Sequence, residues 1–448
     1  MTLLAADQAP GSTRTLARGN GSGWIRRTVL PGGARVITEQ VEGVRSAAFG
    51  AWVQVGSRDE TGHQLGASHF LEHLLFKGTP SRSALEISSA VESVGGQMNA
   101  FTAKEVTCYH AHMLDADLPL AIDIITDMIT SALIRTEDVD SERGVVLEEM
   151  AMRDDDPADL ALEGFSTAVL GDSVVGRPII GTRESITTMS RRTVHGYFRR
   201  KYQPEFLVFA AAGNVDHAAV VRRVRKALAA AGWLDGSATP APPRRITAKR
   251  LAPTDAGVEL VTRDSEQAHL TIGVPGLVVG DERRFTMRVL GAVLGGGMSS
   301  RLFQEVREKR GLAYSVYSFQ ETYADAGMFG IYAGCPPQRF EDVIAVCRDE
   351  LKNIASEPVP ADELASTKGQ LRGGSVLGLE STNSRMSRIG RAEVFDGTVL
   401  PTDQILAAID AVTAEQVQEL ASELFAQPMS ISAVGPFSSK KQLRRAVA

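Results

Sequence analysis

The sequence contains few cysteines. Only Cys108, Cys335 and Cys347 occur among its 448 residues. Their number is odd and no two of them have a C-x-x-C spacing, which excludes a disulfide framework and a zinc site built from cysteines. We therefore expect the protein to work in a reducing compartment.

The sequence also lacks a run of the roughly 18–20 apolar residues that a membrane-spanning helix needs. Residues 1–23 do not combine a charged start with an apolar stretch, as a signal peptide would. We expect these residues to form a disordered N-terminal tail, and we expect a cytoplasmic protein with no membrane partner.

An excess of basic residues is absent as well. There are 48 Lys and Arg against 54 Asp and Glu, and the formal net charge is −6. Without a basic excess the chain is poorly suited to hold a phosphate backbone, so nucleic acid is not an expected partner. The composition, 43% hydrophobic and 23% charged, is that of a folded protein, and the length allows about two to four domains.

A stretch rich in proline and small residues, 236–243 (GSATPAPP), divides the chain nearly in half. With the loosely patterned residues up to 253 it has the composition of a linker. We therefore predict a first domain over residues 24–235, a linker over 236–253 and a second domain over 254–448.

The two halves show matching patterns of elements. A predicted helix at 190–202 and strand at 206–212 correspond to a helix at 413–425 and a strand at 429–434, an offset of 223 from 190 to 413. Upstream, a helix at 84–94 and a strand at 98–109 correspond to a helix at 301–309 and a strand at 313–319. A further amphipathic helix follows in each half, at 118–129 and 340–354. Chance similarity is the alternative, but the common order favours duplication.

The strands alternate apolar and polar residues, which favours antiparallel or mixed sheets with one covered face. The predicted fold class is therefore α+β, with two tandem domains.

One short segment carries most of the chemical signal. Residues 67–76 are helix-patterned and contain His69, Glu72 and His73. Side chains four apart lie on one helix face, so the two imidazoles can bind one metal ion. The pattern H-x-x-E-H is also an inverted zinc-peptidase signature. A pair of hydrogen-bonded core histidines is the alternative.

A catalytic zinc needs a third protein ligand and one open position. The predicted helix at 136–150 offers Glu142 and Glu149, which are seven apart and share a face. An acidic run of this kind is usually a solvated helix face. The predicted helix also contains apolar residues, however, so one of its sides is expected to be buried. Glu148 is the alternative to Glu149, and because a helix turns about 100° per residue, both cannot face one metal.

Together these residues resemble the M16 metallopeptidases, the family of pitrilysin, insulin-degrading enzyme and mitochondrial processing peptidase, and especially its bacterial two-domain, processing-peptidase-like members. The similarity is His69-x-x-Glu72-His73 followed by a glutamate 76 positions later (149 − 73), with another glutamate seven residues before it. The resemblance implies that His69, His73 and Glu149 bind zinc, that Glu72 is the general base and that Glu142 supports the ligands. It also implies the LuxS/MPP-like metallohydrolase fold, with a mostly antiparallel sheet packed with helices in each domain.

The second half carries a further similarity to this family. The segment 300–314 resembles the one in which an arginine and a tyrosine seven residues later reach the scissile peptide, which assigns those roles to Arg307 and Tyr314. Without the family, neither residue would be given a role. Residues 295–297 (GGG) lack the lysine of a phosphate loop and are interpreted as a turn.

The resemblance also extends to the substrate and to the number of metal ions. The strand around Asn99, Ala100 and Phe101 resembles the family's edge strand, whose backbone pairs with an extended peptide. An ordinary half-buried strand is the alternative. In the second half, the helix at 283–294 corresponds to the helix that carries His69 and His73. It contains no histidine, so one Zn²⁺ per chain is expected. The other histidines are interpreted as structural: His63, His110, His112, His195, His217 and His269.

Large family members enclose a chamber with four such domains, and this chain has two. The resemblance therefore implies a homodimer in which Arg307 and Tyr314 of one chain serve the zinc of the other, or a heterodimer with a degenerate homologue. The expected activity is a zinc-dependent endopeptidase that cleaves unfolded peptides or flexible protein termini. The alternatives are a non-catalytic assembly or core subunit of the same fold and a zinc hydrolase of other chemistry.

Overall fold

The chain forms two compact units, each built from discontinuous segments. The computed structural model describes residues 4–18, 23–234, 236–247 and 255–447. Unit 1 consists of Met1–Glu149, Pro178–Thr247 and Val376–Gln404, and unit 2 of Met150–Arg177, Ala248–Ser375 and Ile405–Ala448. These units differ from the continuous ranges 24–235 and 254–448, because each half of the chain contributes a segment to the other unit.

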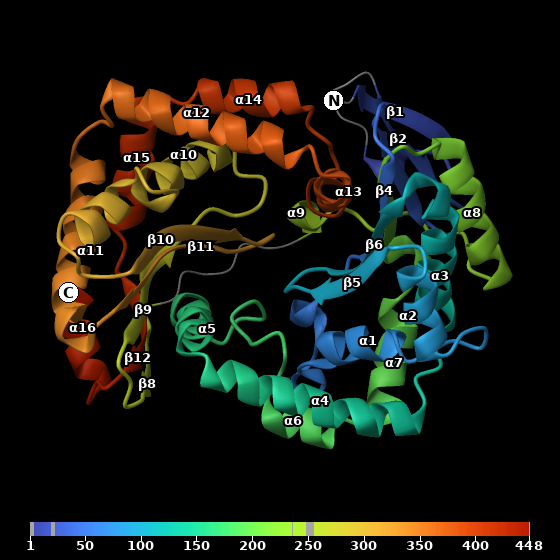
Figure 1. Cartoon of the computed structure of the whole chain (residues 1–448), viewed down its shortest axis with the longest axis horizontal. Coiled ribbons are helices and arrows are strands. Elements are labelled where there is room, and N and C mark those ends of the chain that lie inside the picture. Colours follow the sequence, from blue (N-terminus) through green and yellow to red (C-terminus); the bar gives the residue numbers. More distant parts are fainter. Residues whose placement is uncertain (1–3, 19–22, 235, 248–254, 448) are drawn as a thin grey trace. The chain divides into compact units, whose positions relative to one another are not determined.

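Unit 1 contains a seven-stranded sheet with the order β1-β2-β3-β7-β4-β6-β5. Figure 1 labels its strands β1, β2, β4, β5 and β6. Its strands are β1 (Thr13–Arg18), β2 (Trp24–Val29), β3 (Arg35–Gln40), β4 (Ser46–Val53), β5 (Gln97–Thr102), β6 (Thr107–Leu114) and β7 (Leu207–Gly213). The β3–β7 pair is parallel and the other pairs are antiparallel. The helices that lie in unit 1 or begin there are α1 (Ala67–Leu75), α2 (Ala84–Glu92), α3 (Leu118–Ser131), α4 (Thr136–Asp155), α6 (Arg183–Thr188), α7 (Arg191–Lys201), α8 (His217–Ala230), α9 (Arg244–Thr247), α13 (Thr382–Arg391) and α14 (Thr402–Asp410).

Unit 2 contains a five-stranded sheet with the order β10-β11-β9-β12-β8. Its strands are β8 (Val258–Thr262), β9 (Ala268–Pro275), β10 (Ser315–Thr322), β11 (Gly327–Cys335) and β12 (Ser430–Gly435). The β12–β8 pair is parallel and the others are antiparallel. The helices that lie in unit 2 or begin there are α5 (Pro157–Leu170), α10 (Arg284–Gly295), α11 (Phe340–Ser356), α12 (Ala361–Gly378), α15 (Ala414–Phe425) and α16 (Lys440–Val447).

The two sheets have the same topology, which confirms the predicted α+β class with mostly antiparallel sheets. The order β3-β7-β4-β6-β5 in unit 1 corresponds strand for strand to β8-β12-β9-β11-β10 in unit 2, including the single parallel pair. Unit 1 adds β1 and β2 at one edge. In both sheets the first strand after helix α1 or its counterpart α10, which is β5 or β10, lies at the other edge.

Two local predictions are wrong in detail. The single strand predicted at 98–109 is a hairpin of β5 and β6, closed by a tight turn in which Ala103 N–H donates to Val106 O at 2.8 Å. The segment predicted as a helix at 301–309 is helical, but its residues Phe303–Glu308 form a π-helix. Alternation of apolar residues continues through a short turn, so the hairpin is not visible in the pattern.

The N-terminal tail predicted as disordered contains a strand. Residues 13–18 form β1, which pairs antiparallel with β2. The hydroxyl groups of Thr13 and Thr28 are hydrogen-bonded at 2.6 Å. The strand was not predicted because its sequence, TRTLAR, is mostly polar and lacks a clear alternation of apolar residues. Residues 1–3 and 19–22 of the predicted tail, and 248–253 of the predicted linker, lie outside the described residues.

Equivalent helices are exchanged between the two halves of the chain. Helix α13, from the C-terminal half, packs on β4 and β7 of unit 1, where Met386 and Ile389 join a buried cluster with Trp52. Helix α5, from the N-terminal half, packs on β9 and β12 of unit 2.

A buried ion-pair cluster fixes α13 to the unit 1 sheet. Arg385 and Arg388 bind the two oxygens of Glu39 on β3 at 2.7 and 2.9 Å. Breaking a buried pair of this kind on one side is strongly destabilising. The cluster therefore specifies where α13 docks.

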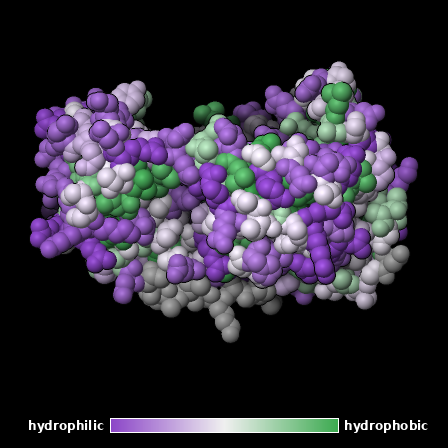
Figure 2. Space-filling view, turned by 90° about the horizontal axis from the view of Figure 1, so that it is seen from below, coloured by the Kyte–Doolittle hydropathy of each residue, from purple (hydrophilic) through white to green (hydrophobic). Residues whose placement is uncertain are grey.

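None of the described helices is long and apolar enough to cross a membrane. The face shown in Figure 2 is mostly hydrophilic, with hydrophobic residues in small groups between the polar ones.

His217, at the start of α8, gives a prediction for acid stability. Its Nε2 and Nδ1 atoms are hydrogen-bonded to Thr28 Oγ1 and Thr38 Oγ1, each at 2.8 Å. Burial, with a smaller effect of Arg26, lowers the His217 pKa from 6.5 to about 4. The unfolded chain then binds the extra proton between these values, so the free energy of unfolding should fall as pH drops from about 6.5 toward 4.

Denaturant titrations of the chelator-treated protein across this pH range would measure the effect. The His217→Gln variant should show a shallower pH dependence than the wild type. Equal pH dependence in both proteins would contradict the assignment.

Candidate metal centre

Helix α1 spans Ala67–Leu75, close to the predicted 67–76. Phe70, Leu71, Leu74 and Leu75 are fully buried and fix the helix against unit 1. The opposite side carries His69 and His73, whose side chains are 19% and 17% exposed. Their ring centroids are 4.8 Å apart, so the two imidazoles lie within reach of one ion.

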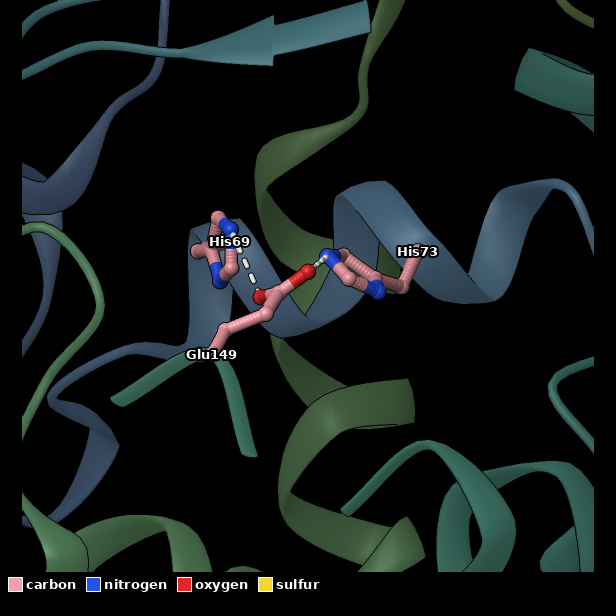
Figure 3. A group of neighbouring side chains, drawn as sticks. All are labelled: His69, His73 and Glu149. Atoms are coloured by element: carbon pink, nitrogen blue, oxygen red, sulfur yellow. Dashed lines mark ion pairs between the residues drawn. The ribbon is translucent and has the colours of Figure 1, made fainter. Parts of the chain in front are cut away.

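Glu149 on α4 completes a group of three possible ligands. Its Oε2 lies 3.7 Å from His69 Nε2 and its Oε1 lies 3.5 Å from His73 Nε2. Figure 3 shows the Glu149 carboxylate between the two imidazole rings of α1. Among the described residues, only these three form a group of His, Cys, Asp or Glu whose ligand atoms all lie within 4.8 Å of one another. Glu148, the alternative, is exposed and outside the group.

The geometry fits a bound zinc ion. Two ligands at about 2.0–2.1 Å from a tetrahedral zinc are roughly 3.3–3.4 Å apart. The distances here are slightly longer, 3.5 Å from Glu149 Oε1 to His73 Nε2 and 3.7 Å from Glu149 Oε2 to His69 Nε2, and each involves a different oxygen of the carboxylate. Glu149 Oε2 is buried and has no hydrogen-bond partner among the described residues, as expected for an atom that faces a cation. Burial, and then the charge of His73, lowers the pKa of His69 to about 4, which favours the neutral imidazole that binds metals.

Glu142, about two turns before Glu149 on the same face of α4, orients His73. Its Oε2 lies 3.2 Å from His73 Nδ1 and its Oε1 lies 2.6 Å from Lys77 Nζ. A carboxylate on the second nitrogen of a ligand histidine fixes the tautomer and the ring orientation. Sequence reasoning missed Lys77, although its position four residues after His73 places it on the same face of the segment.

Glu72 directly precedes His73 on α1 but is not part of the group of three. Thr102 on β5 donates a hydrogen bond to Glu72 Oε2 at 2.5 Å. Burial raises the pKa of Glu72 above its ordinary value, against the hydrogen bond from Thr102 and the charge of His73, while Glu149 adds to the increase. A carboxylate with a raised pKa is a stronger base. Thr102 was expected only as a strand residue.

The strand β5 has a free edge, since within the described residues it pairs only with β6. Asn99 is exposed and Ala100 half-buried. The Phe101 ring packs on Trp52, with centroids 5.7 Å apart, so its side chain contributes to the core. Substrate contacts by Asn99, Ala100 and Phe101 stay a prediction about the backbone of this edge.

Arg307 and Tyr314 lie together in unit 2. Arg307 Nη1 donates to the Tyr314 carbonyl oxygen at 2.9 Å, and the guanidinium carbon lies 4.4 Å from the Tyr314 ring centroid and 4.8 Å from that of Phe303. Tyr314 is 76% exposed and precedes β10. The pair is therefore preformed, with the tyrosine side chain free to contact another molecule. Phe303 was not predicted, although it lies one turn before Arg307.

No other histidine belongs to the metal group within the described residues. His217 is hydrogen-bonded to two threonines, and His269 Nδ1 to Tyr332 Oη at 2.8 Å, as expected for structural histidines. His110 and His112 lie on β6 and are half-buried. Gly295 ends α10, and residues 296–297 form the bend that follows it.

Comparisons with known proteins agree with this geometry. The family profile "Insulinase (Peptidase family M16)" matches residues 35–183, and the profile "Peptidase M16 inactive domain" matches residues 188–371. A protein of Streptomyces coelicolor named as an uncharacterized zinc protease is 51% identical over 98% of this chain and 95% of its own. A similarly named protein of Bacillus subtilis is 38% identical over 92% of this chain and 98% of its own.

Solved structures show the same fold. A protease from Helicobacter pylori has a TM-score of 0.84 at 21% identity, over 94% of this chain and 100% of that chain. A peptidase M16 inactive domain from Pseudomonas fluorescens has a TM-score of 0.81 at 19% identity, over 93% and 99% of the two chains.

Proposed function

The chain belongs to peptidase family M16, and on this premise we propose that it is a zinc-dependent endopeptidase. Relatives along nearly its whole length are named zinc proteases, which supports a protease role. The proposed substrates are unfolded peptides or flexible protein termini. One zinc ion per chain and a cytoplasmic location remain predictions.

The observation that carries the proposal is Glu72. A purely structural subunit has no need for a partly buried carboxylate next to a possible ligand histidine, because burying a charge costs free energy. The description "inactive domain" applies to residues 188–371, whereas all the proposed metal residues lie in the part matched by the other profile. We therefore propose one active site per chain, in the part that the Insulinase profile matches, and a non-catalytic core subunit is the alternative.

In the proposed mechanism, His69, His73 and Glu149 hold the zinc ion, and Glu142 orients His73. When bound, zinc would polarise the peptide carbonyl and lower the pKa of a water molecule. Glu72, held by Thr102, would accept a proton from the attacking water and deliver it to the leaving amine.

Two residues of unit 2 are proposed to act on the developing oxyanion. Arg307 stacks on the Tyr314 ring and so limits its conformations. The Tyr314 hydroxyl would then donate a hydrogen bond to the oxyanion, an effect that depends on a preorganised donor. The free edge of β5 would bind the extended substrate through main-chain hydrogen bonds, which are available from any sequence.

We propose that the protein is a homodimer in which these two residues act on the zinc site of the partner subunit. A symmetric dimer is the commonest assembly of identical chains, and each chain carries both sets of residues. A heterodimer with a degenerate homologue is the alternative.

Mixing two inactive variants tests the proposal. Glu72→Gln and Tyr314→Phe chains are incubated together at equal concentration, and cleavage of a quenched peptide library is measured. If subunits exchange and sites are shared, half of the dimers are mixed and each has one intact site, so roughly a quarter of wild-type activity should return. No recovery would contradict sharing, and a zinc-loaded wild type that cleaves no peptide would contradict the peptidase itself.

A further inference from the structure

The metal helix α1 begins at a residue that cannot cap it. Its N-cap, Gly66, is in the left-handed conformation with φ 86° and offers no side-chain acceptor. The first N–H groups of a helix have no acceptor within the helix and are costly to bury without one. Gly66 is also closely enclosed, since a Cβ there would lie 2.5 Å from Ile180 O. The start of α1 therefore needs an acceptor from another segment.

Glu60 supplies this acceptor with both carboxylate oxygens. Gly66 N–H donates to Oε2 and Ser68 N–H donates to Oε1, each at 2.7 Å. Glu60 is only 4% exposed, and within the described ranges no lysine or arginine forms an ion pair with it. The hydrogen bonds from these N–H groups, at the positive end of the helix, therefore compensate its burial.

Retaining this carboxylate has a cost. Burial raises the pKa of Glu60 to about 7, although the hydrogen bonds from Ser68 and Gly66 act to lower it. The hydrogen bonds at the start of α1 therefore offset part of the cost of burying this carboxylate.

The two ligand histidines of α1 differ in how they are held. His73 is fixed through Nδ1 by Glu142. His69 Nδ1 is buried and has no hydrogen-bond partner among the described residues, so its orientation depends on the backbone of the first helical turn. Ser68 directly precedes His69, and its hydroxyl is hydrogen-bonded to Tyr197 Oη at 2.8 Å. Glu60 and Tyr197 thus hold the turn that aims His69.

We propose that Glu60 is a positioning residue for the metal centre, which fixes the first turn of α1 and thereby places His69 for zinc. This inference rests on the proposed function, because it assumes that His69, His73 and Glu149 bind zinc. It assigns to Glu60 a role in metal affinity and not only in stability.

Zinc affinity of the full-length Glu60→Gln variant tests the proposal. The amide keeps the size of the side chain but presents an NH₂ group to one of the two N–H donors. We expect zinc affinity, measured by competition with a chelator well below the melting temperature, to fall by about 10- to 100-fold, as for other residues that support ligands. Glu60→Asp, which keeps the charge but is shorter, should fall between Glu60→Gln and wild type.

Glu86→Gln is the matched control. Glu86 accepts the Ser83 N–H at the start of α2 at 2.8 Å, but it is exposed and its helix carries no proposed ligand. Its zinc affinity should stay within about twofold of the wild type. Folded Glu60→Gln and Glu60→Asp variants with wild-type affinity would overturn the inference and leave the proposed function intact. A wild-type chain that binds no zinc would overturn both.

Discussion

The Glu72→Gln variant should lose almost all peptidase activity while it keeps its zinc. Glutamine preserves the size of the side chain and can still accept the hydrogen bond from Thr102, but it cannot accept a proton at neutral pH. General-base catalysis contributes about 10²–10⁴-fold, so kcat on a quenched peptide should fall by this factor. Zinc per chain should match the wild type, because Glu72 is outside the group of possible ligands.

Glu148→Gln is the control for this experiment. Glu148 is exposed on α4 and removing its charge should leave both kcat and zinc content unchanged. A Glu72→Gln protein with near wild-type kcat would mean that another group takes the proton. A variant that lost its zinc would instead place Glu72 among the ligands.

Helix α1 and the shared face of its two histidines were predictable because their sequence signal is local. His69, Glu72 and His73 lie within five residues, and the helical repeat alone brings the histidines to one face. Glu149 is 76 residues beyond His73 (149 − 73), and no periodicity connects the two segments. Its selection over Glu148 depended on the family spacing, and the structure places Glu149 beside the histidines.

The supporting contacts were not predictable in the same way. Glu60 reaches the start of α1 from six and eight residues away through an irregular segment, and Thr102 reaches Glu72 across 30 positions. Their residue types have many ordinary uses, so only the folded backbone reveals their partners.

The exchange of α5 and α13 had no sequence signal either. An amphipathic pattern shows that a helix has a buried face but not which sheet covers it. In this chain Arg385 and Arg388 form ion pairs with Glu39, which lies more than 300 positions earlier in the sequence. The duplicated topology, by contrast, was predictable, because both halves repeat the same order of elements.

Replacing Glu149 should remove the metal from the protein. Glu149→Gln leaves a neutral amide, a weaker ligand, between His69 and His73. Zinc affinity should fall by more than the ~10–100-fold expected for residues that only support a ligand, and peptidase activity should fall with it. Glu148→Gln, one position away on the same helix, is the matched control and should behave as the wild type.

The zinc content of these three proteins tests the central claim most directly. After dialysis against a weak chelator, elemental analysis should find about one zinc per chain in the wild type and in Glu148→Gln, and almost none in Glu149→Gln. Equal zinc in Glu149→Gln and the wild type, or a wild type that retains none, would contradict a metal centre built from His69, His73 and Glu149.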